Sequence, residues 1–452
     1  MSPKSHIAIV PEQPTGDVSL LPRGYALPFV LVATLFFLWG IPNNLNDVLI
    51  RQFMKSFVMT RLEAGLIQSA FYMGYFLLAI PAALVMRRFG YKSGFVIGLF
   101  LFSLGAILFW PAANVGRYSF FLVALFIIAS GLSFLETAAN PFITQLGDPR
   151  TAARRLNLAQ AFNPLGSIAG VLVGTIFIFS GVELNPHQVA NLQARNAYSS
   201  YLHTETLRVV TPYLALSALT FTMMILIAVT RFPALAEAEY HDGEHGQLRS
   251  LLGRPHFLFA IAAQFAYVGA QVGTWSYFIP YIQAYTHEPE KAAGFFLTAT
   301  LVLFGVGRFI SAWLMRYVQP SRLMAIYAIV NTALAAIGIL FPGWIGICAL
   351  LLTSFFMSLM YPTIFAQGIR GLGENTKLGG SLIVMAIVGG AVLTPVMGFI
   401  SVRSGALAPA YIVPALAYLL IAFYSIADMR RLDPGPTPSF PPARSPRRHK
   451  RC

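Results

Sequence analysis

The amino-acid sequence predicts an all-α membrane protein whose twelve transmembrane helices form two six-helix bundles. Its composition excludes an ordinary soluble domain, because 56% of the 452 residues are hydrophobic and only 11% are charged, whereas soluble domains carry about 25% charged residues. Twelve apolar segments reach the length of about 20 residues that a bilayer-spanning helix needs. A polar interruption after the sixth segment divides them into two equal groups.

The predicted spans are separated by short clusters of charged and turn-forming residues, such as 87–92 and 147–150. Two longer polar segments, 182–210 and 232–256, follow the fifth and the sixth span. In chain order the predicted spans cover roughly residues 26–49, 64–86, 93–113, 118–142, 157–180, 211–231, 257–285, 292–315, 322–341, 345–368, 378–400 and 407–428.

This pattern divides the chain into five predicted regions. They are an N-terminal cytoplasmic tail (1–25), a first bundle (26–231), a cytoplasmic loop between the bundles (232–256), a second bundle (257–428) and a basic, proline-rich cytoplasmic tail (429–452). The N-terminal tail lacks the charged-then-apolar layout of a cleaved signal peptide, so we expect the first span to stay in the membrane. We expect the C-terminal tail to be disordered, because it is polar and rich in proline.

The distribution of lysine and arginine predicts the orientation, because cytoplasmic loops of membrane proteins carry an excess of these residues. If the N-terminus is cytoplasmic, the tails and the even-numbered loops hold 22 of the 31 basic residues, and the opposite side holds eight. Both termini are then cytoplasmic. The net charge of +14 therefore belongs to loops and tails and does not predict a nucleic-acid partner.

The two halves of the chain share weak sequence similarity. Residues 83–87 (Ala-Leu-Val-Met-Arg), after the second span, match residues 312–316 (Ala-Trp-Leu-Met-Arg), after the eighth. Asn140 and Pro141, near the end of the fourth span, correspond to Tyr361 and Pro362 in the tenth. Parallel six-span repeats are typical of one large class of transporters, which bind their substrate between the halves near the middle of the membrane.

We place only two acidic residues, Asp47 and Glu136, inside predicted spans, and no histidine. A carboxylate within the bilayer is costly and usually faces a cavity or a transport pathway. Such a group can take up and release a proton near neutral pH. The alternative is a structural ion pair with Arg308, in the eighth span. If a proton crosses the membrane with a substrate, these two carboxylates are the candidates to carry it.

Amide side chains recur at helical spacing on the first, fifth and seventh spans, and aromatic residues accompany them. A single amide inside a membrane usually hydrogen-bonds a neighbouring helix, but a set of this size favours a cavity. Amides match neighbouring sugar hydroxyls as donors and acceptors, and aromatic faces suit the C–H face of a sugar ring. The candidate cavity residues are Trp39, Asn43, Gln160, Asn163, Gln271, Trp275, Phe304 and Tyr361.

Signals for enzymatic chemistry are missing from the sequence. It contains no phosphate-binding loop and no His-Glu-x-x-His motif. Its two cysteines, Cys348 and Cys452, offer neither a disulfide framework nor metal-ligand spacing. We therefore expect neither an enzyme nor a cofactor or metal site. No cluster of cations within the spans is present to bind a phosphate or a carboxylate, which argues against an anionic substrate.

Seven motifs follow one another along the chain: 36–40 (Phe-Phe-Leu-Trp-Gly), 43–47 (Asn-Asn-Leu-Asn-Asp), 64–72 (Ala-Gly-Leu-Ile-Gln-Ser-Ala-Phe-Tyr), 135–142 (Leu-Glu-Thr-Ala-Ala-Asn-Pro-Phe), 157–163 (Asn-Leu-Ala-Gln-Ala-Phe-Asn), 267–271 (Tyr-Val-Gly-Ala-Gln) and 361–365 (Tyr-Pro-Thr-Ile-Phe). In this order they resemble the fucose/proton symporter family of the major facilitator superfamily. The resemblance extends from about residue 26 to about residue 428.

The resemblance implies the major facilitator fold, alternating access and import of a hexose with a proton by a monomer in the inner membrane of a bacterium. It implies that Asp47 and Glu136 are the proton-coupling carboxylates. We assign Asp47 to proton uptake and sugar gating near the outer end of the first span, and Glu136 to the coupling step. The residues that it implies to line the sugar cavity are Trp39, Asn43, Gln160, Asn163, Trp275, Phe304 and Tyr361.

The chain departs from the superfamily at the loop after the second span. That loop usually reads Gly-x-x-x-Asp-Arg-x-Gly, but Ala83 and Arg87 occupy the Gly and Asp positions here. The related glucose/galactose branch shares the Phe-Phe-Leu-Trp-Gly motif, whereas the paired residues Asn43 and Asn44 favour the fucose branch.

We therefore predict a proton-coupled symporter that is embedded in the lipid bilayer and imports a neutral monosaccharide, with L-fucose as the first candidate. Three alternatives remain open: import of glucose or galactose, proton-driven export of apolar compounds, and a sugar sensor that does not transport. Sodium is an alternative coupling ion, since a carboxylate with nearby amides can hold either ion. The amides count against an exporter, and only short polar segments are available for signalling by a sensor.

Overall fold

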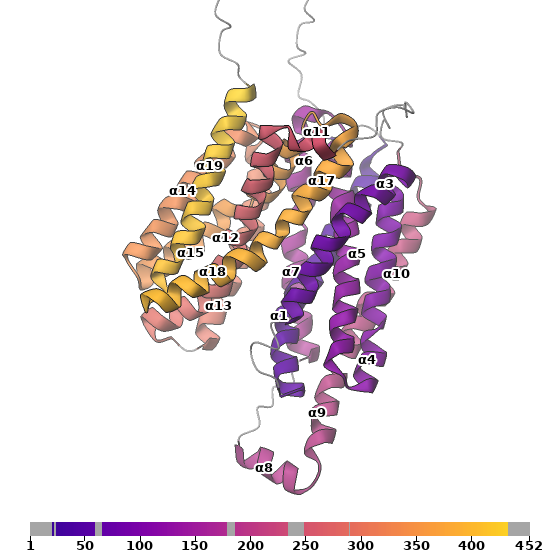
Figure 1. Cartoon of the computed structure of the whole chain (residues 1–452), viewed down its shortest axis with the longest axis vertical. Coiled ribbons are helices and arrows are strands. Elements are labelled where there is room, and N and C mark those ends of the chain that lie inside the picture. Colours follow the sequence, from indigo (N-terminus) through magenta and orange to yellow (C-terminus); the bar gives the residue numbers. More distant parts are fainter. Residues whose placement is uncertain are drawn as a thin grey trace, which may run out of the picture.

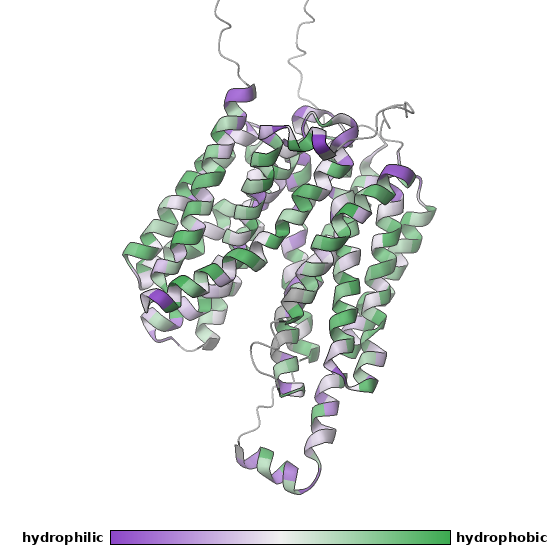
Figure 2. Ribbon diagram, in the orientation of Figure 1, coloured by the Kyte–Doolittle hydropathy of each residue, from purple (hydrophilic) through white to green (hydrophobic). Residues whose placement is uncertain are grey.

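The computed structural model describes residues 20–21, 24–58, 66–178, 186–233, 248–288 and 290–432, which fold into helices joined by short turns. The long helices form two groups that follow the order of the chain (Figure 1). Hydrophobic residues cover most of their length, and hydrophilic residues gather near the two ends of the molecule (Figure 2). The all-α architecture that the sequence predicts is confirmed.

The first bundle contains the long helices of the first six predicted spans and shorter helices between them. In chain order these are α1 (Ala26–Ser56), α3 (Leu66–Ile107), α4 (Phe109–Val115), α5 (Tyr118–Gln145), α6 (Ala152–Gln160), α7 (Asn163–Val173), α8 (Pro186–Ala194), α9 (Tyr198–Leu207) and α10 (Val210–Val229). A 3-10 turn, η1 (Pro149–Thr151), precedes α6, and a π-helical turn, η2 (Gly174–Ile178), follows α7.

The second bundle contains the remaining spans. Its helices are α11 (Leu248–Leu252), α12 (Pro255–Thr286), α13 (Glu290–Leu314), α14 (Pro320–Leu340), α15 (Trp344–Met357), α16 (Met360–Gly368), α17 (Thr376–Met385), α18 (Gly389–Ser404) and α19 (Ile412–Leu432), with 3-10 turns at η3 (Gly373–Asn375), η4 (Ala386–Val388) and η5 (Ala408–Tyr411). Residues 234–247 of the predicted loop between the bundles and the tail after Leu432 lie outside the described residues.

Eleven segments of the described chain are long and apolar enough to cross a membrane. One of them, Ala70–Val115, has 46 residues and contains both the second and the third predicted span. The two spans meet within α3 at Gly90, whose φ of 77° interrupts the helix. Only glycine adopts this conformation without steric cost, so it allows one span to follow the other almost without a loop. The structure is therefore consistent with twelve spans.

Three of the predicted spans are interrupted within their length. The fifth is divided into α6 and α7 at residues 161–162, and Pro164, in the first turn of α7, has no backbone N–H to continue the helix. The tenth is divided into α15 and α16, and the eleventh is interrupted by η4. Breaks of this kind are tolerated inside a membrane where the chain is buried in protein or lines a cavity.

Two glycines bring α1 and α7 into close contact. A Cβ atom added at Gly166 would overlap the backbone carbonyl of Phe37, and one added at Gly40 would overlap the carbonyl of Asn163. Small residues at helix interfaces allow this approach in membrane proteins. The contact determines how far apart the side chains of α1 and α7 stand.

The two bundles meet at the end of the molecule that carries α6, α11 and α17, and they lie apart toward the end that carries α9 and α13 (Figure 1). Where they meet, one buried hydrophobic cluster contains Phe142 of the first bundle together with Phe365 and Ile383 of the second. Asn157 also donates a hydrogen bond of 3.1 Å to the hydroxyl of Thr363 across the bundles. We call this end the closed end.

Helices α8 and α9, in the segment predicted as a polar connection, project from the opposite end (Figure 1). Glu205, in α9, is only 2% exposed and forms ion pairs with Lys55 at 3.0 Å and with Arg208 at 3.5 Å. Partial burial of Lys55 opposes its charge, but hydrogen bonds to Tyr201 and Glu205 outweigh this effect and raise the pKa of Lys55. These contacts attach α9 to the end of α1.

Candidate functional site

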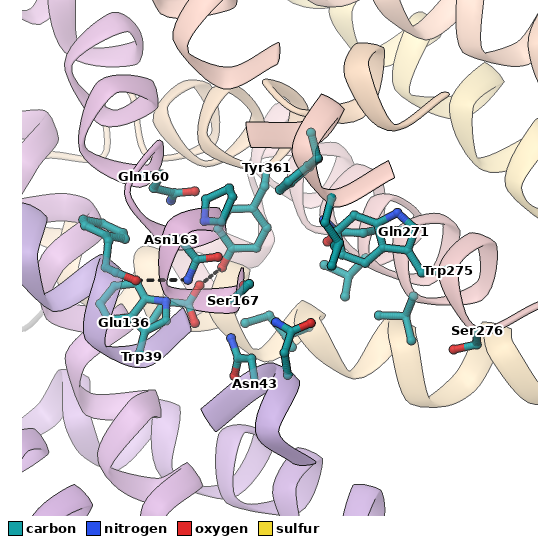
Figure 3. A pocket seen from close by; sticks show the side chains of 18 of the residues that line it. Trp39, Asn43, Glu136, Gln160, Asn163, Ser167, Gln271, Trp275, Ser276 and Tyr361 are labelled. Atoms are coloured by element: carbon teal, nitrogen blue, oxygen red, sulfur yellow. Dashed lines mark hydrogen bonds between the residues drawn. The ribbon is translucent and has the colours of Figure 1, made fainter. Parts of the chain in front are cut away.

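A cavity of about 590 Å³ lies between the two bundles, with lining residues from α1, α3, α5, α6 and α7 on one side and α12, α13 and α16 on the other. Its volume lies within the range of small-molecule sites. Figure 3 shows side chains of both bundles around it. The structure brings together all eight predicted cavity residues: Trp39, Asn43, Gln160, Asn163, Gln271, Trp275, Phe304 and Tyr361 all line the cavity.

Glu136, on α5, also lines the cavity and is 7% exposed. The hydroxyl group of Tyr361, on α16, donates a hydrogen bond of 2.5 Å to its Oε1 atom (Figure 3). Tyr75, on α3, interacts with the same carboxylate. The buried acid of the first bundle is therefore held by a hydroxyl donor of the second bundle.

The break between α6 and α7 places two amides beside the cavity. Gln160 is the last residue of α6, and its Nε2 donates to the Oδ1 of Asn140 at 2.8 Å. Asn163 is the first residue of α7, and its Nδ2 donates to the backbone carbonyl of Phe36 at 3.1 Å (Figure 3). Among the described residues the Oδ1 atom of Asn43 has no hydrogen-bond partner. A buried polar atom of this kind is suited to accept a hydrogen bond from a ligand hydroxyl.

Aromatic rings from both bundles complete the lining. Trp39 packs against Phe36 in the first bundle, with ring centroids 4.3 Å apart. In the second bundle, Trp275 meets Phe304 edge to face at 5.2 Å. The indole N–H of Trp275 donates to the hydroxyl of Ser354 at 3.2 Å, which fixes the orientation of its ring. Among the described residues, the cavity thus combines amides, the carboxylate of Glu136 and aromatic faces.

Arg308, on α13, is 4% exposed and reaches across to the first bundle. Its Nη1 donates to the backbone carbonyl of Gln160 at 2.6 Å and to the Oε1 of the same residue at 3.2 Å, while its Nε donates to the carbonyl of Ser358 at 3.1 Å. The guanidinium lies 4.7 Å from the ring centroid of Phe304. These hydrogen bonds go to carbonyl oxygens and not to the carboxylate of Glu136. An ion pair between Arg308 and a carboxylate was the structural alternative that the sequence left open.

Asp47 lies in α1, one turn after Asn43, but its side chain lies outside the described residues. Its assignment to proton uptake and gating therefore stays a prediction. The neighbouring side chains of Asn43 and Asn44 line the cavity.

Several polar residues at the cavity were not among the predicted set. They are Asn44, Tyr72, Tyr75, Ser167, Ser276 and Arg308. Helical spacing carries a signal for one of them, because Ser167 follows Asn163 by one turn and therefore lies on the same helix face. Tyr72 and Tyr75 belong to α3, and only the packing of α3 beside α5 brings Tyr75 to the carboxylate of Glu136.

The expectation that only two acidic residues lie inside the spans was incomplete. Asp428 ends the last predicted span, but α19 continues to Leu432 and Asp428 is 1% exposed. Ser321 donates to it at 2.6 Å, and His256 and Arg370 lie within 3.5 Å and 3.6 Å. His256 likewise belongs to α12 rather than to a loop. The described part of the chain contains no group of three or more His, Cys, Asp or Glu side chains that could hold a metal ion.

Comparison with known proteins adds independent findings. Residues 29–377 match the family description "Major Facilitator Superfamily". The chain is 46% identical over 410 residues to the L-fucose-proton symporter of Escherichia coli (strain K12), covering 89% of this chain and 93% of that protein. It is 34% identical over 416 residues to the glucose/galactose transporter of Brucella abortus biovar 1 (strain 9-941), covering 89% and 94%. A crystal structure of the transporter FucP in the outward conformation matches with a TM-score of 0.83 at 45% identity, covering 90% of this chain and 99% of that one.

Proposed function

This chain belongs to the fucose/proton symporter family of the major facilitator superfamily, and we propose that it imports a neutral monosaccharide together with a proton. L-Fucose is the first candidate, because the symporter named for that sugar is 46% identical to this chain and the glucose/galactose transporter is 34% identical. The observation that carries the proposal is the buried carboxylate of Glu136 beside amides and aromatic rings in one cavity.

The cavity suits both the hydroxyl groups and the apolar C–H face of a sugar. Amides such as Asn43, Asn163 and Gln271 can donate to and accept from adjacent hydroxyl groups. The rings of Trp39 and Trp275 offer flat apolar surfaces to the C–H groups of a sugar ring. Among the described lining residues Arg308 is the single cation, and carbonyl oxygens already occupy it. A neutral substrate therefore fits this cavity better than an anionic one.

Protonation of Glu136 would couple the proton to the movement of the bundles. A hydrogen bond to a charged acceptor is roughly twice as strong as one between neutral groups. When a proton neutralises the carboxylate, its bond from Tyr361 weakens, and Tyr361 belongs to the other bundle. Proton binding thereby loosens a contact that joins the bundles. In this scheme Asp47 takes up the proton near the outer end of α1 and passes it toward Glu136.

We infer the orientation from the distribution of basic residues, which assigns both termini and the closed end to the cytoplasm. The cavity then faces the outer side of the membrane, and alternating access would move the bundle contact from the inner to the outer end. We propose a monomer that is embedded in the inner membrane of a bacterium.

Uptake by right-side-out membrane vesicles tests this function. Labelled L-fucose at an outside pH of ~6, below the inside pH, is expected to accumulate, and accumulation should stop when the gradient is collapsed. The Asp47→Asn variant should lose gradient-driven accumulation. Equal accumulation by this variant and the natural chain would disprove the role of Asp47, and a requirement for sodium in place of the pH gradient would disprove proton coupling.

A panel of L-fucose, galactose, glucose, mannose and arabinose, each assayed for sugar-induced proton uptake, identifies the substrate. The largest signal is expected for L-fucose. A larger signal with glucose or galactose would favour the second candidate, which rests on the 34% identity to the glucose/galactose transporter.

A further inference from the structure

Lys377 connects the two bundles at the closed end. It is the second residue of α17, and its Nζ donates a hydrogen bond of 2.9 Å to the backbone carbonyl of Met86, on α3. The ammonium also lies 5.0 Å from the ring centroid of Tyr91. Met86 and Tyr91 stand on opposite sides of the bend at Gly90. A single side chain of the second bundle therefore contacts both spans that meet at this bend of the first bundle.

The position of this lysine is unfavourable for α17 alone. The N-terminus of a helix carries a partial positive charge, so a cation in the first turn is destabilising there. The first turn of α17 contains no acidic residue to offset the charge. The residue at the acidic position of the superfamily loop is Arg87, which cannot accept a hydrogen bond from the ammonium. The contacts of Lys377 on α3 give it instead a carbonyl oxygen and an aromatic face, both of which attract a cation.

We propose that Lys377 is a latch of the closed end. Its contacts with α3 stabilise the conformation in which the bundles meet at this end, and they must break before the cavity can open there. The proposal rests on the alternating-access cycle proposed above, but it does not depend on which sugar or coupling ion is carried.

The partly buried surroundings of Lys377 strengthen its contacts with α3. The side chain is partly buried, and the next residue of α17, Leu378, packs into the joint hydrophobic cluster. A side chain at Gly380 would touch Phe365 and, in the first bundle, Pro141. The contact is thus partly shielded from water, and a charge-assisted hydrogen bond is stronger in such a place than on an open surface.

Lys92 supplies a matched control for the same chemistry. Its Nζ donates to the backbone carbonyls of Ala228 and Thr230 at 2.7 Å and 3.0 Å, at the end of α10. Both partners belong to the same bundle as Lys92, so this contact does not cross between the bundles. Loss of Lys92 should affect the first bundle alone and leave the balance between open and closed ends unchanged.

A cysteine reporter measures opening of the closed end directly. With Cys348 and Cys452 replaced by serine, a cysteine is placed at Ala366, which is 6% exposed in the joint cluster. Inside-out vesicles are treated with a membrane-impermeant maleimide in the absence of sugar. We expect Lys377→Met to raise the labelling rate about tenfold, the effect of losing one hydrogen bond to a charged group. Lys377→Arg should raise it less, and Lys92→Met should leave it unchanged.

Two outcomes would overturn the latch: labelling of Lys377→Met at the parent rate, or an equal increase in Lys92→Met. Melting temperatures of the purified variants show that each is folded. If Lys377→Met does not fold, Tyr91→Leu tests the aromatic half of the contact, with an expected increase of about two- to fivefold, and Tyr91→Phe should match the parent. An unchanged rate in Tyr91→Leu would then refute the proposal. Because no sugar is present, failure of sugar transport would leave this result valid.

Discussion

The hydroxyl group of Tyr361, on α16, donates a hydrogen bond of 2.5 Å to the carboxylate of Glu136, on α5. This bond joins the second bundle to the single acidic side chain that the structure places at the cavity among the described residues. Its position means that a change in the charge of Glu136 acts on the contact between the bundles. The first two predictions follow from this arrangement.

Tyr361→Phe should slow gradient-driven sugar uptake about tenfold, because a hydrogen bond to a charged group contributes about 1.5–3 kcal/mol. The variant removes only the hydroxyl and keeps the ring. Tyr317→Phe is the control, since Tyr317 is 72% exposed and is not among the described residues that line the cavity. Initial rates of labelled sugar uptake in vesicles measure the effect. Equal rates for Tyr361→Phe and the control would show that this bond does not contribute to coupling.

Glu136→Gln should separate exchange from accumulation. The amide keeps the shape of the side chain but cannot bind and release a proton at physiological pH. We expect the variant to exchange labelled for unlabelled sugar across the membrane and to fail to concentrate sugar under a pH gradient. Counterflow and accumulation assays on the same vesicles provide the measurement. A variant that still concentrates sugar would exclude Glu136 as the coupling carboxylate.

Trp275→Ala should weaken sugar binding about tenfold, because the face of an aromatic ring contributes up to about 1.5 kcal/mol beyond its buried area. The indole is held in place by Ser354, so it offers a rigid surface in the cavity. The value of KM for uptake reports the change. Trp110→Ala, at a tryptophan that is 55% exposed outside the cavity, should leave KM unaltered. A similar rise in KM for both variants would point to a general loss of packing.

Gly166→Ala should destabilise the first bundle by about 1–3 kcal/mol, because its methyl group would overlap the carbonyl of Phe37 and force α1 and α7 apart. Gly294→Ala, on α13, meets no atom within 4 Å and should be neutral or stabilising by up to about 1 kcal/mol. Thermal melting in detergent compares the two variants. A melting temperature of Gly166→Ala at or above that of Gly294→Ala would contradict the close α1–α7 contact.

Most of the cavity could be predicted because its residues are exceptions in an apolar chain. Amides such as Asn43 and Gln160 are costly in a membrane, so their presence and helical spacing indicate a polar face. A residue that was missed, Asp428, has an ordinary position in the sequence. Asp428 lies where a span meets its flanking loop, and composition alone does not tell whether such a carboxylate is buried or solvated.

The sequence by itself determined the number and order of the spans, the two halves and the set of side chains that a cavity would need. These properties depend on local composition. Each span must be apolar and must satisfy its backbone hydrogen bonds within the helix, and each polar side chain inside a span must find a partner. Which exceptions meet was decided only by the tertiary structure. Glu136 and Tyr361 are 225 residues apart, and Lys377 reaches α3 only because two bundles pack together at one end. No local pattern encodes such contacts, since they arise from the packing of complete helices.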